Sequence, residues 1–280
     1  MPYQQVSGLR LHYHESGPAA GPPVVFLPGL GGDGRWWRPV ARFLEDRYRC
    51  ICLDPRDSGR SGRASAPYTV AEMAADVVGF CRGLGLGPVN LVGYSLGGAV
   101  AQEVAIGWPD LVRRLALVAT YTSGDPRGAA ILRGLASLRR SLPREEYLRL
   151  LFPWVYSHQE YRQAGLVDEA VATTAADPLW LEDDAYERQV EAALSFHSEG
   201  RLAAVTCPTM LVFGDEDIMT PLRFAHRLRQ ELPSSRLVIL AGTGHGLLFT
   251  RWRELASLLR SFLDEDLERP PAGEGVATDR

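Results

Sequence analysis

The sequence predicts an α/β protein with a mostly parallel central sheet, helices on both faces and an inserted helical cap. Short runs rich in Val, Ile and Leu alternate with stretches of helical length in residues 1–122 and again in 201–267. Glycine-rich turns follow several of these runs. The chain has 280 residues, of which 46% are hydrophobic, so it can bury a full core without disulfides or a metal.

The first part of the chain begins with a predicted hairpin over 6–15, because Ser7 and Gly8 separate two alternating segments. The elements expected next are a strand at 23–27, a helix at 36–44, a strand at 48–53, a helix at 70–84, a strand at 89–92, a helix at 96–106 and a strand at 115–119. Strands that alternate with helices of this length form βαβ units, whose parallel sheet is covered on both faces.

The pattern changes over 123–200, where helical segments follow one another without clear strands. We interpret this segment as a helical cap (lid) broken at Pro143, Pro153 and Pro178. The alternation then resumes with a strand at 210–213, a helix at 221–232, a strand at 237–240 and a helix at 252–263. The final residues, 268–280, are rich in Pro and small polar residues and are expected to be disordered.

The composition excludes several function classes. All 30 basic residues are arginine, which rules out Schiff-base lysines, Ser-Lys hydrolases and lysine-bearing phosphate loops. The net charge of -4 argues against a nucleic-acid partner. The N-terminus has no basic region followed by an apolar stretch, and no apolar run is long enough to span a membrane, so we expect an unanchored cytoplasmic protein. The oligomeric state is not encoded in any recognisable pattern.

Ser95 is the predicted nucleophile. It lies in the run Gly93-Tyr94-Ser95-Leu96-Gly97, between an expected strand and an expected helix. A serine in such a strained turn can project its hydroxyl above the sheet only if the residues two before and two after it lack side chains. A G-x-S-x-G string alone is weak evidence, but the strand before it and the helix after it favour a nucleophile elbow.

A serine hydroxyl needs a base, and without lysine that base should be a histidine. His245 alone lies in a glycine-rich loop after a late strand. The other five have ordinary expected settings: a solvent-facing side of the hairpin, the cap segment or its edge, and a helix surface (His12, His14, His158, His197, His226). The orienting acid is expected to be Asp217, with Asp215 as second choice and Asp125 as a weaker third.

The oxyanion of an acyl-transfer reaction needs two main-chain donors. The amide of Leu96 follows the nucleophile at a helix N-terminus, where free N–H groups point outward. The second donor is expected from the Pro28-Gly29-Leu30 loop, at the amide of Leu30.

These motifs together resemble the α/β-hydrolase superfamily, from about residue 3 to residue 264. The matching runs are PGLGG at 28–32, DPRDSGRS at 54–61, GYSLGG at 93–98, GDEDIMTP at 214–221 and GTGHG at 242–246. Their order gives Ser, Asp, His, as that family has it. Within the family the chain looks like compact bacterial carboxylesterases and 3-oxoadipate enol-lactonase-like hydrolases with a helical cap.

The sequence departs from the family pattern at two places. The first loop has Pro28 where the family usually has His, and the second motif has Asp57 and Ser58 where Gly and often His are usual. The main-chain donor at Leu30 should survive the first change. We interpret 54–61 as a structural turn.

The expected function is cofactor-free hydrolysis of carboxylic esters of small molecules through an acyl-enzyme, with no metal. Lactone or carbon–carbon bond hydrolysis on the same fold is the near alternative, a perhydrolase side activity is possible, and a non-catalytic ligand binder is the alternative from another class. Four cap aromatics are candidates for an apolar substrate pocket, although such residues more often form cap core: Phe152, Trp154, Tyr156 and Trp180.

Overall fold

Eight strands form one sheet within residues 2–265, the part of the chain that this computed structural model describes. Their order is β1-β2-β4-β3-β5-β6-β7-β8. The first two pairings, β1 with β2 and β2 with β4, are antiparallel, and all later ones are parallel. The predicted mostly parallel sheet is thereby confirmed. The predicted disordered tail at 268–280 lies outside the described residues.

The strands lie close to where the sequence predicts them. They are β1 (Tyr3–Val6), β2 (Leu9–Ser16), β3 (Pro23–Leu27), β4 (Arg49–Leu53), β5 (Val89–Tyr94), β6 (Val112–Val118), β7 (Thr209–Gly214) and β8 (Arg236–Leu240). The predicted hairpin is present, and its turn residues Ser7 and Gly8 have φ of 47° and 83°. Positive φ at both turn positions suits the right-handed twist of the paired strands.

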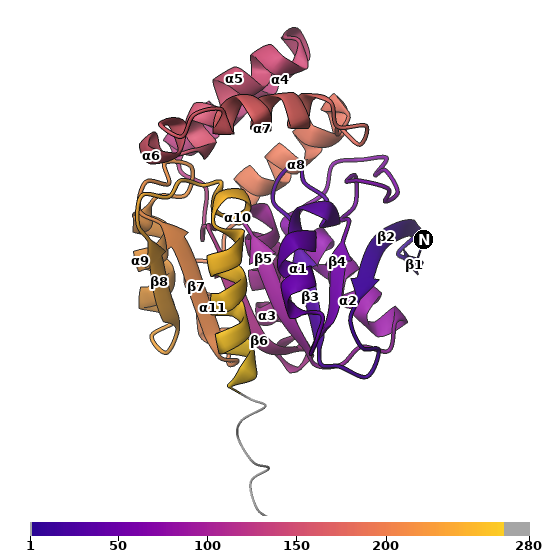
Figure 1. Ribbon diagram of the computed structural model, residues 1–280. Coiled ribbons are helices and arrows are strands. Elements are labelled where there is room, and N and C mark those ends of the chain that lie inside the picture. The colour runs from indigo at the N-terminus through magenta and orange to yellow at the C-terminus, as the bar shows by residue number, and fades with distance from the viewer. Residues whose placement is uncertain (1, 266–280) are drawn as a thin grey trace, which may run out of the picture.

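Five of the longer helices cover the two faces of the sheet (Figure 1). They are α1 (Arg38–Leu44), α2 (Val70–Gly83), α3 (Leu96–Gly107), α9 (Leu222–Glu231) and α11 (Trp252–Asp264). In β3, Val24 and Phe26 face the core cluster shared with α1 and α11, whereas Val25 and Leu27 face the cluster shared with α2, α3 and α9. Alternate side chains of β3 therefore pack into two separate apolar cores, as expected of a sheet buried on both sides.

Five further helices lie over the carboxyl ends of the parallel strands (Figure 1). We call them the cap helices: α4 (Pro126–Ser141), α5 (Arg144–Val155), α6 (His158–Tyr161), α7 (Leu166–Ala175) and α8 (Asp183–Ser195). They occupy the segment predicted as a cap, and a bridge between Ser123 and His197 joins its two ends. Within residues 2–265, no helix is both long and apolar enough to span a bilayer.

Two sequence predictions need correction here. The expected helix at 36–44 is a 3-10 turn, η1 (Gly34–Trp37), followed by α1. The expected break at Pro153 does not occur, because α5 continues through it to Val155. Pro153 lies in the last turn of α5, so the hydrogen bond that its missing N–H cannot make is one of the last in the helix. The short elements η2 (Pro109–Leu111), η3 (Leu202–Ala204) and α10 (Leu247–Thr250) complete the described chain.

Candidate active site

Ser95 lies between the last residue of β5 and the first residue of α3. Its backbone has φ 53° and ψ -117°, a conformation that L-residues rarely adopt. A Cβ atom on Gly93 would lie 2.3 Å from the carbonyl oxygen of Gly97, and one on Gly97 would lie 2.4 Å from those of Leu27 and Pro28. The two glycines thus allow the sharp turn on which the Ser95 hydroxyl stands.

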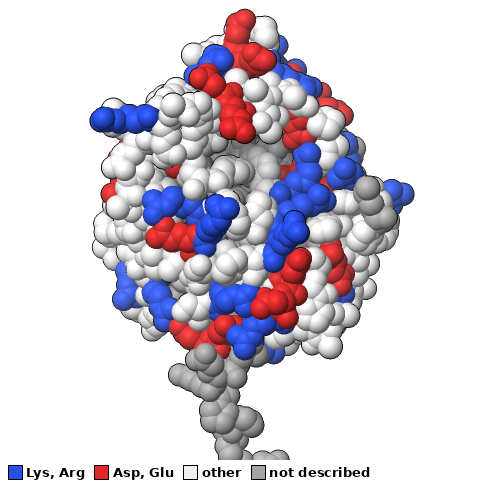
Figure 2. Space-filling model, viewed as in Figure 1, with Lys and Arg blue, Asp and Glu red and all other residues white. Residues whose placement is uncertain are grey.

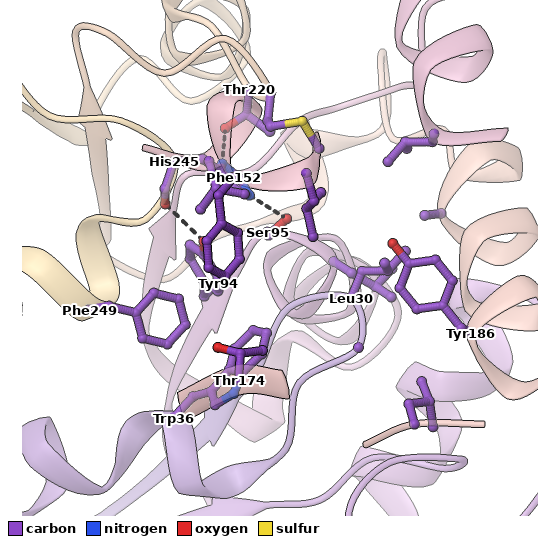
Figure 3. A pocket seen from close by; sticks show the side chains of 18 of the residues that line it. Leu30, Trp36, Tyr94, Ser95, Phe152, Thr174, Tyr186, Thr220, His245 and Phe249 are labelled. Carbon is purple, nitrogen blue, oxygen red and sulfur yellow. Dashed lines mark hydrogen bonds between the residues drawn. The ribbon is translucent and has the colours of Figure 1, made fainter. Parts of the chain in front are cut away.

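The loop after β8 brings His245 to this hydroxyl. His245 Nε2 lies 3.1 Å from Ser95 Oγ (Figure 3). On the other side of the ring, His245 Nδ1 lies 2.8 Å from Asp217 Oδ2. A carboxylate can only accept, so Nδ1 carries the proton and Nε2 is free to accept from the serine. The hydroxyl of Tyr94 donates to the His245 carbonyl at 2.8 Å and fixes the main chain of the loop.

Asp217 is buried and saturated with donors. It accepts from His245, from the amides of Met219 and Thr220 at 2.8 Å each, and from the Thr220 hydroxyl at 2.6 Å. Burial alone would raise the pKa of Asp217, but the positive charge that His245 can carry, together with these hydrogen bonds, lowers it below the ordinary value. The carboxylate therefore stays ionised beside the imidazole.

The structure places the two alternative acids elsewhere. Asp215 is exposed and accepts from the Thr243 amide at 3.3 Å. Asp125 caps α4 by accepting from the Gly128 amide at 2.7 Å and forms an ion pair with Arg223. Neither carboxylate contacts His245, so Asp217 is the acid that the fold brings to the histidine.

The amides of Leu30 and Leu96 flank Ser95. Leu96 is the first residue of α3, and the loop of Leu30 packs so closely that a Cβ on Gly29 would lie 3.1 Å from Ser95 Cβ. Within residues 2–265, neither amide donates to a protein acceptor. An acyl-transfer reaction requires two such main-chain donors for its oxyanion.

A cavity of about 510 Å³ lies between the cap helices and Ser95. Most of its lining is apolar, and Ser95 and His245 form part of its wall. Figure 2 shows a hollow on this side of the molecule, below the cap helices, with an uncharged interior and arginine side chains on either side. A cavity of this size accommodates a small organic molecule.

Three of the four predicted pocket aromatics line this cavity: Phe152, Tyr156 and Trp180. Trp154 does not. Phe152 and Tyr156 are four residues apart along α5 and its C-terminal end and so share a face, whereas Trp154, two residues from each, lies on the opposite side. It packs instead against the apolar cluster of the cap helices.

Cap helix α8 contacts the predicted oxyanion loop through side chains that the sequence analysis missed. Gln189 is 1% exposed; its Oε1 accepts from the Gly31 amide at 2.8 Å and its Nε2 donates to Ser58 Oγ at 2.9 Å. Its neighbour Arg188 forms two hydrogen bonds of 2.9 Å with Asp57. Asp57 and Ser58 are the residues that depart from the family pattern, and that departure was the available signal.

Cap helix α6 and the residues just before it make a second set of contacts, with the loop that carries His245. The buried carboxylate of Glu160 accepts from the Gly244 amide at 3.2 Å, and Ser157 donates to the Gly242 carbonyl at 2.8 Å. The Gly246 amide donates to the Val155 carbonyl at 2.8 Å. The cap helices therefore touch both the loop of Leu30 and the loop of His245.

One predicted histidine setting is wrong. His12 is not solvent-facing but 3% exposed, and its Nδ1 lies 2.9 Å from Asp54 Oδ2. The turn that follows β4 covers this side of the hairpin, which alternation within the hairpin alone does not reveal. Within residues 2–265, no cluster of three or more His, Cys, Asp or Glu side chains has the geometry of a metal site.

The comparisons with known proteins agree with this architecture. Residues 22–251 match the family described as alpha/beta hydrolase fold. A protein of Caulobacter sp. (strain K31), named "Putative carbamate hydrolase RutD", is 30% identical over 92% of this chain and 96% of its own length. One of the same name from Variovorax paradoxus (strain S110) is 31% identical over 91% of this chain and 96% of its own length.

Two solved structures show the same fold. The enol-lactonase from Burkholderia xenovorans LB400 has a TM-score of 0.84 at 23% identity and covers 94% of this chain and 99% of its own. A thermophilic esterase from Thermogutta terrifontis has a TM-score of 0.82 at 23% identity, with coverage of 94% and 96%. At this identity the likeness concerns the fold.

Proposed function

Because this chain belongs to the α/β hydrolase fold family, we propose that it is a serine hydrolase that cleaves carboxylic esters at Ser95. The observation that carries the proposal is the continuous contact from Ser95 Oγ to His245 Nε2, at 3.1 Å, and from His245 Nδ1 to Asp217, at 2.8 Å. This contact ends at the wall of a cavity large enough for a substrate.

In the first half of the proposed reaction, Ser95 Oγ forms a bond to the ester carbonyl carbon while its proton passes to His245 Nε2. The amides of Leu30 and Leu96 stabilise the oxyanion. The bond to the alcohol oxygen then breaks, and the alcohol leaves with the proton from His245. Water repeats the sequence on the acyl-enzyme, which releases the acid and restores Ser95. No cofactor takes part in these steps.

The cavity lining supports esters with an apolar acyl or alcohol group. Phe152, Tyr156 and Trp180 supply apolar surface from the cap side. Removal of such groups from water would provide most of the binding free energy of the substrate.

The relatives named as carbamate hydrolases give a second candidate, hydrolysis of a carbamate by the same residues. A lactone is a cyclic ester and requires no other chemistry. Steady-state rates on an acyl ester and an N-alkyl carbamate of the same alcohol distinguish ester hydrolysis from carbamate hydrolysis. We expect the ester to turn over faster, because an amide-like nitrogen makes the carbamate carbonyl less electrophilic.

The decisive variant is Ser95→Ala. On p-nitrophenyl butyrate it should lose at least about 10⁴-fold in kcat, because the nucleophile is gone. Ser257→Ala, which removes a hydroxyl that donates to the Arg253 carbonyl on α11, should keep wild-type activity. Full activity of Ser95→Ala would overturn the proposal. A wild-type protein that binds esters tightly without turnover would identify a ligand-binding protein instead.

A further inference from the structure

Two tyrosine hydroxyls meet at the cap side of the cavity. Tyr147 of α5 and Tyr186 of α8 are buried, line the cavity, and have their hydroxyl oxygens 3.2 Å apart. Figure 3 shows the Tyr186 hydroxyl pointing into the space above Leu30, toward the part of the cavity that contains Ser95. We call Tyr147 and Tyr186 the tyrosine pair.

The tyrosine pair has two O–H donors, and the hydrogen bond between the two hydroxyls uses only one of them. Within the described residues, neither hydroxyl donates to any other protein group. Burial raises the pKa of Tyr147 and that of Tyr186, so both keep their protons at neutral pH. One buried O–H of the pair therefore has no protein acceptor in residues 2–265.

The guanidinium of Arg139 packs against the ring of Tyr186. It lies 4.6 Å from the centre of the Tyr186 ring and 4.5 Å from that of Trp180. A positive charge over the ring stabilises electron density on the phenol oxygen and so makes the Tyr186 hydroxyl a stronger hydrogen-bond donor. Two other tyrosines of the cavity wall differ: Tyr121 donates to the Ala193 carbonyl at 3.3 Å, and Tyr94 donates to the His245 carbonyl.

We propose that the tyrosine pair is a specificity subsite that donates a hydrogen bond to a second oxygen of the substrate, remote from the carbonyl that Ser95 attacks. The preferred substrates are then esters whose apolar chain carries a neutral carbonyl oxygen, as in keto esters. The expected preference in hydrolysis rests on the proposed function, whereas the expected preference in binding does not. An unpaired buried donor disfavours ligands that leave it unpaired, which is how such a group discriminates.

A neutral oxygen fits better than a carboxylate. The arginines that line the cavity, Arg35 and Arg139, already form ion pairs, the first with Asp33 and Asp177 and the second with Asp183. A substrate carboxylate would enter a largely apolar space beside Asp33, Asp125 and Asp177, which also line it. A ketone needs only the free donor.

The test is a set of p-nitrophenyl esters paired by chain length: 4-oxopentanoate with pentanoate, 5-oxohexanoate with hexanoate, and 6-oxoheptanoate with heptanoate. The measured quantity is the ratio of kcat/KM for the keto ester to that for its alkyl partner. The proteins are the wild type, the double variant Tyr147→Phe/Tyr186→Phe, and the control Tyr121→Phe, whose lost hydroxyl already has a protein acceptor.

For the wild type and Tyr121→Phe, we expect the ratio to exceed about fivefold at one chain length, as one neutral hydrogen bond allows. In the double variant the ratio should fall to about one, through a higher KM for the keto ester. The subsite is overturned if the double variant keeps the preference, if it loses both substrates equally, or if the wild type shows none. If the wild type prefers succinate monoesters and the double variant loses this preference, the subsite binds a carboxylate rather than a neutral carbonyl oxygen, and the inference is wrong on that point.

Binding separates this inference from the proposed function. In Ser95→Ala the same ester pairs can be titrated without turnover by the fluorescence of the tryptophans that line the cavity, Trp36 and Trp180. We expect tighter binding of one keto ester, abolished when Tyr147→Phe/Tyr186→Phe is added. If the wild type hydrolyses none of the esters, the proposed function fails, and this titration still decides the subsite.

Discussion

The described part of the chain, residues 2–265, contains two buried His–Asp pairs of nearly equal geometry. His245 Nδ1 lies 2.8 Å from Asp217 Oδ2, and His12 Nδ1 lies 2.9 Å from Asp54 Oδ2. Both rings are less than a tenth exposed, at 7% and 3%. By distance and burial alone the two pairs cannot be told apart.

They differ in what surrounds them. The second nitrogen of His245 faces Ser95 at the cavity wall, whereas the His12 ring packs edge-on against Tyr3 with ring centres 5.2 Å apart. Asp54 accepts from the amides of Gly34 and Arg60 and so holds two loops. A buried His–Asp pair is therefore a structural element that becomes a catalytic candidate only where a nucleophile and a cavity adjoin it.

The largest expected effect is on activity. His245→Ala should lower kcat on p-nitrophenyl butyrate by about 10⁴-fold or more, because Ser95 loses its base. His12→Ala should leave kcat within about twofold and lower the free energy of unfolding by about 3 kcal/mol, because Asp54 loses its buried partner. Steady-state kinetics and urea unfolding of both variants measure these effects. Equal loss of activity in folded His12→Ala would remove the distinction between the pairs.

Loss of the contact between α8 and the predicted oxyanion loop should lower kcat less than loss of His245 does. It should lower kcat more than loss of the contact between α8 and Asp57. In Gln189→Leu the Gly31 amide loses its acceptor, and the neighbouring Leu30 amide is held less firmly. We expect kcat to fall about tenfold with KM within twofold, because the oxyanion forms only in the transition state. Arg188→Gln is the matched control, since it loosens the same helix at Asp57 without touching the loop of Leu30. Equal kcat in the two variants would show that Gln189 acts only as a cap contact.

Thr220 tests how firmly the Asp217 carboxylate must be held. Its hydroxyl donates to Asp217 Oδ2 and its oxygen lies 3.2 Å from His245 Nδ1 (Figure 3). Thr220→Val should lower kcat by about three- to fivefold, the value of one hydrogen bond. Thr220→Ser should restore most of it, because the hydroxyl is retained. A serine variant as slow as the valine variant would assign the effect to packing.

The smallest predicted effect is a difference in pH dependence. The pKa of Asp217 is lowered, so its stabilising contribution is present above about pH 4 and is lost as pH falls through its folded pKa. Burial raises the pKa of Asp54, so its contribution is fullest below about pH 4 and declines as pH rises through its folded pKa.

Urea unfolding between pH 3 and pH 7 checks these signs. The stability difference between wild type and Asp217→Asn should shrink as pH falls. The difference between wild type and Asp54→Asn should instead grow more favourable to the wild type as pH falls. Parallel curves for the two variants would contradict the opposite pKa shifts.

The sheet and the surroundings of Ser95 follow from local sequence because their causes are local. The continuous apolar run of β3 predicts two covered faces, and Gly93 and Gly97 are sterically required beside Ser95. Ser95, Asp217 and His245 each follow a parallel strand, so their loops meet at the same edge of the sheet.

The contacts of the cap helices could not be predicted in this way. Gln189 meets Gly31 across 158 residues, and Tyr147 of α5 meets Tyr186 of α8 because both helices pack on α4. Such pairs depend on the relative position of helices, which periodicity does not encode. Trp154 illustrates the same limit, because its aromatic character indicated a pocket while the face of α5 on which it lies excluded it.

Covalent labelling tests the central claim that Ser95 is an activated nucleophile. A fluorophosphonate is added to the folded wild type, Ser95→Ala and His245→Ala, and intact mass and peptide mapping are followed with time. We expect one label per wild-type chain, located on Ser95, no label on Ser95→Ala, and labelling of His245→Ala slowed by about 10³-fold. A wild-type protein that stays unlabelled, or a Ser95→Ala protein labelled to the same extent, would contradict the account.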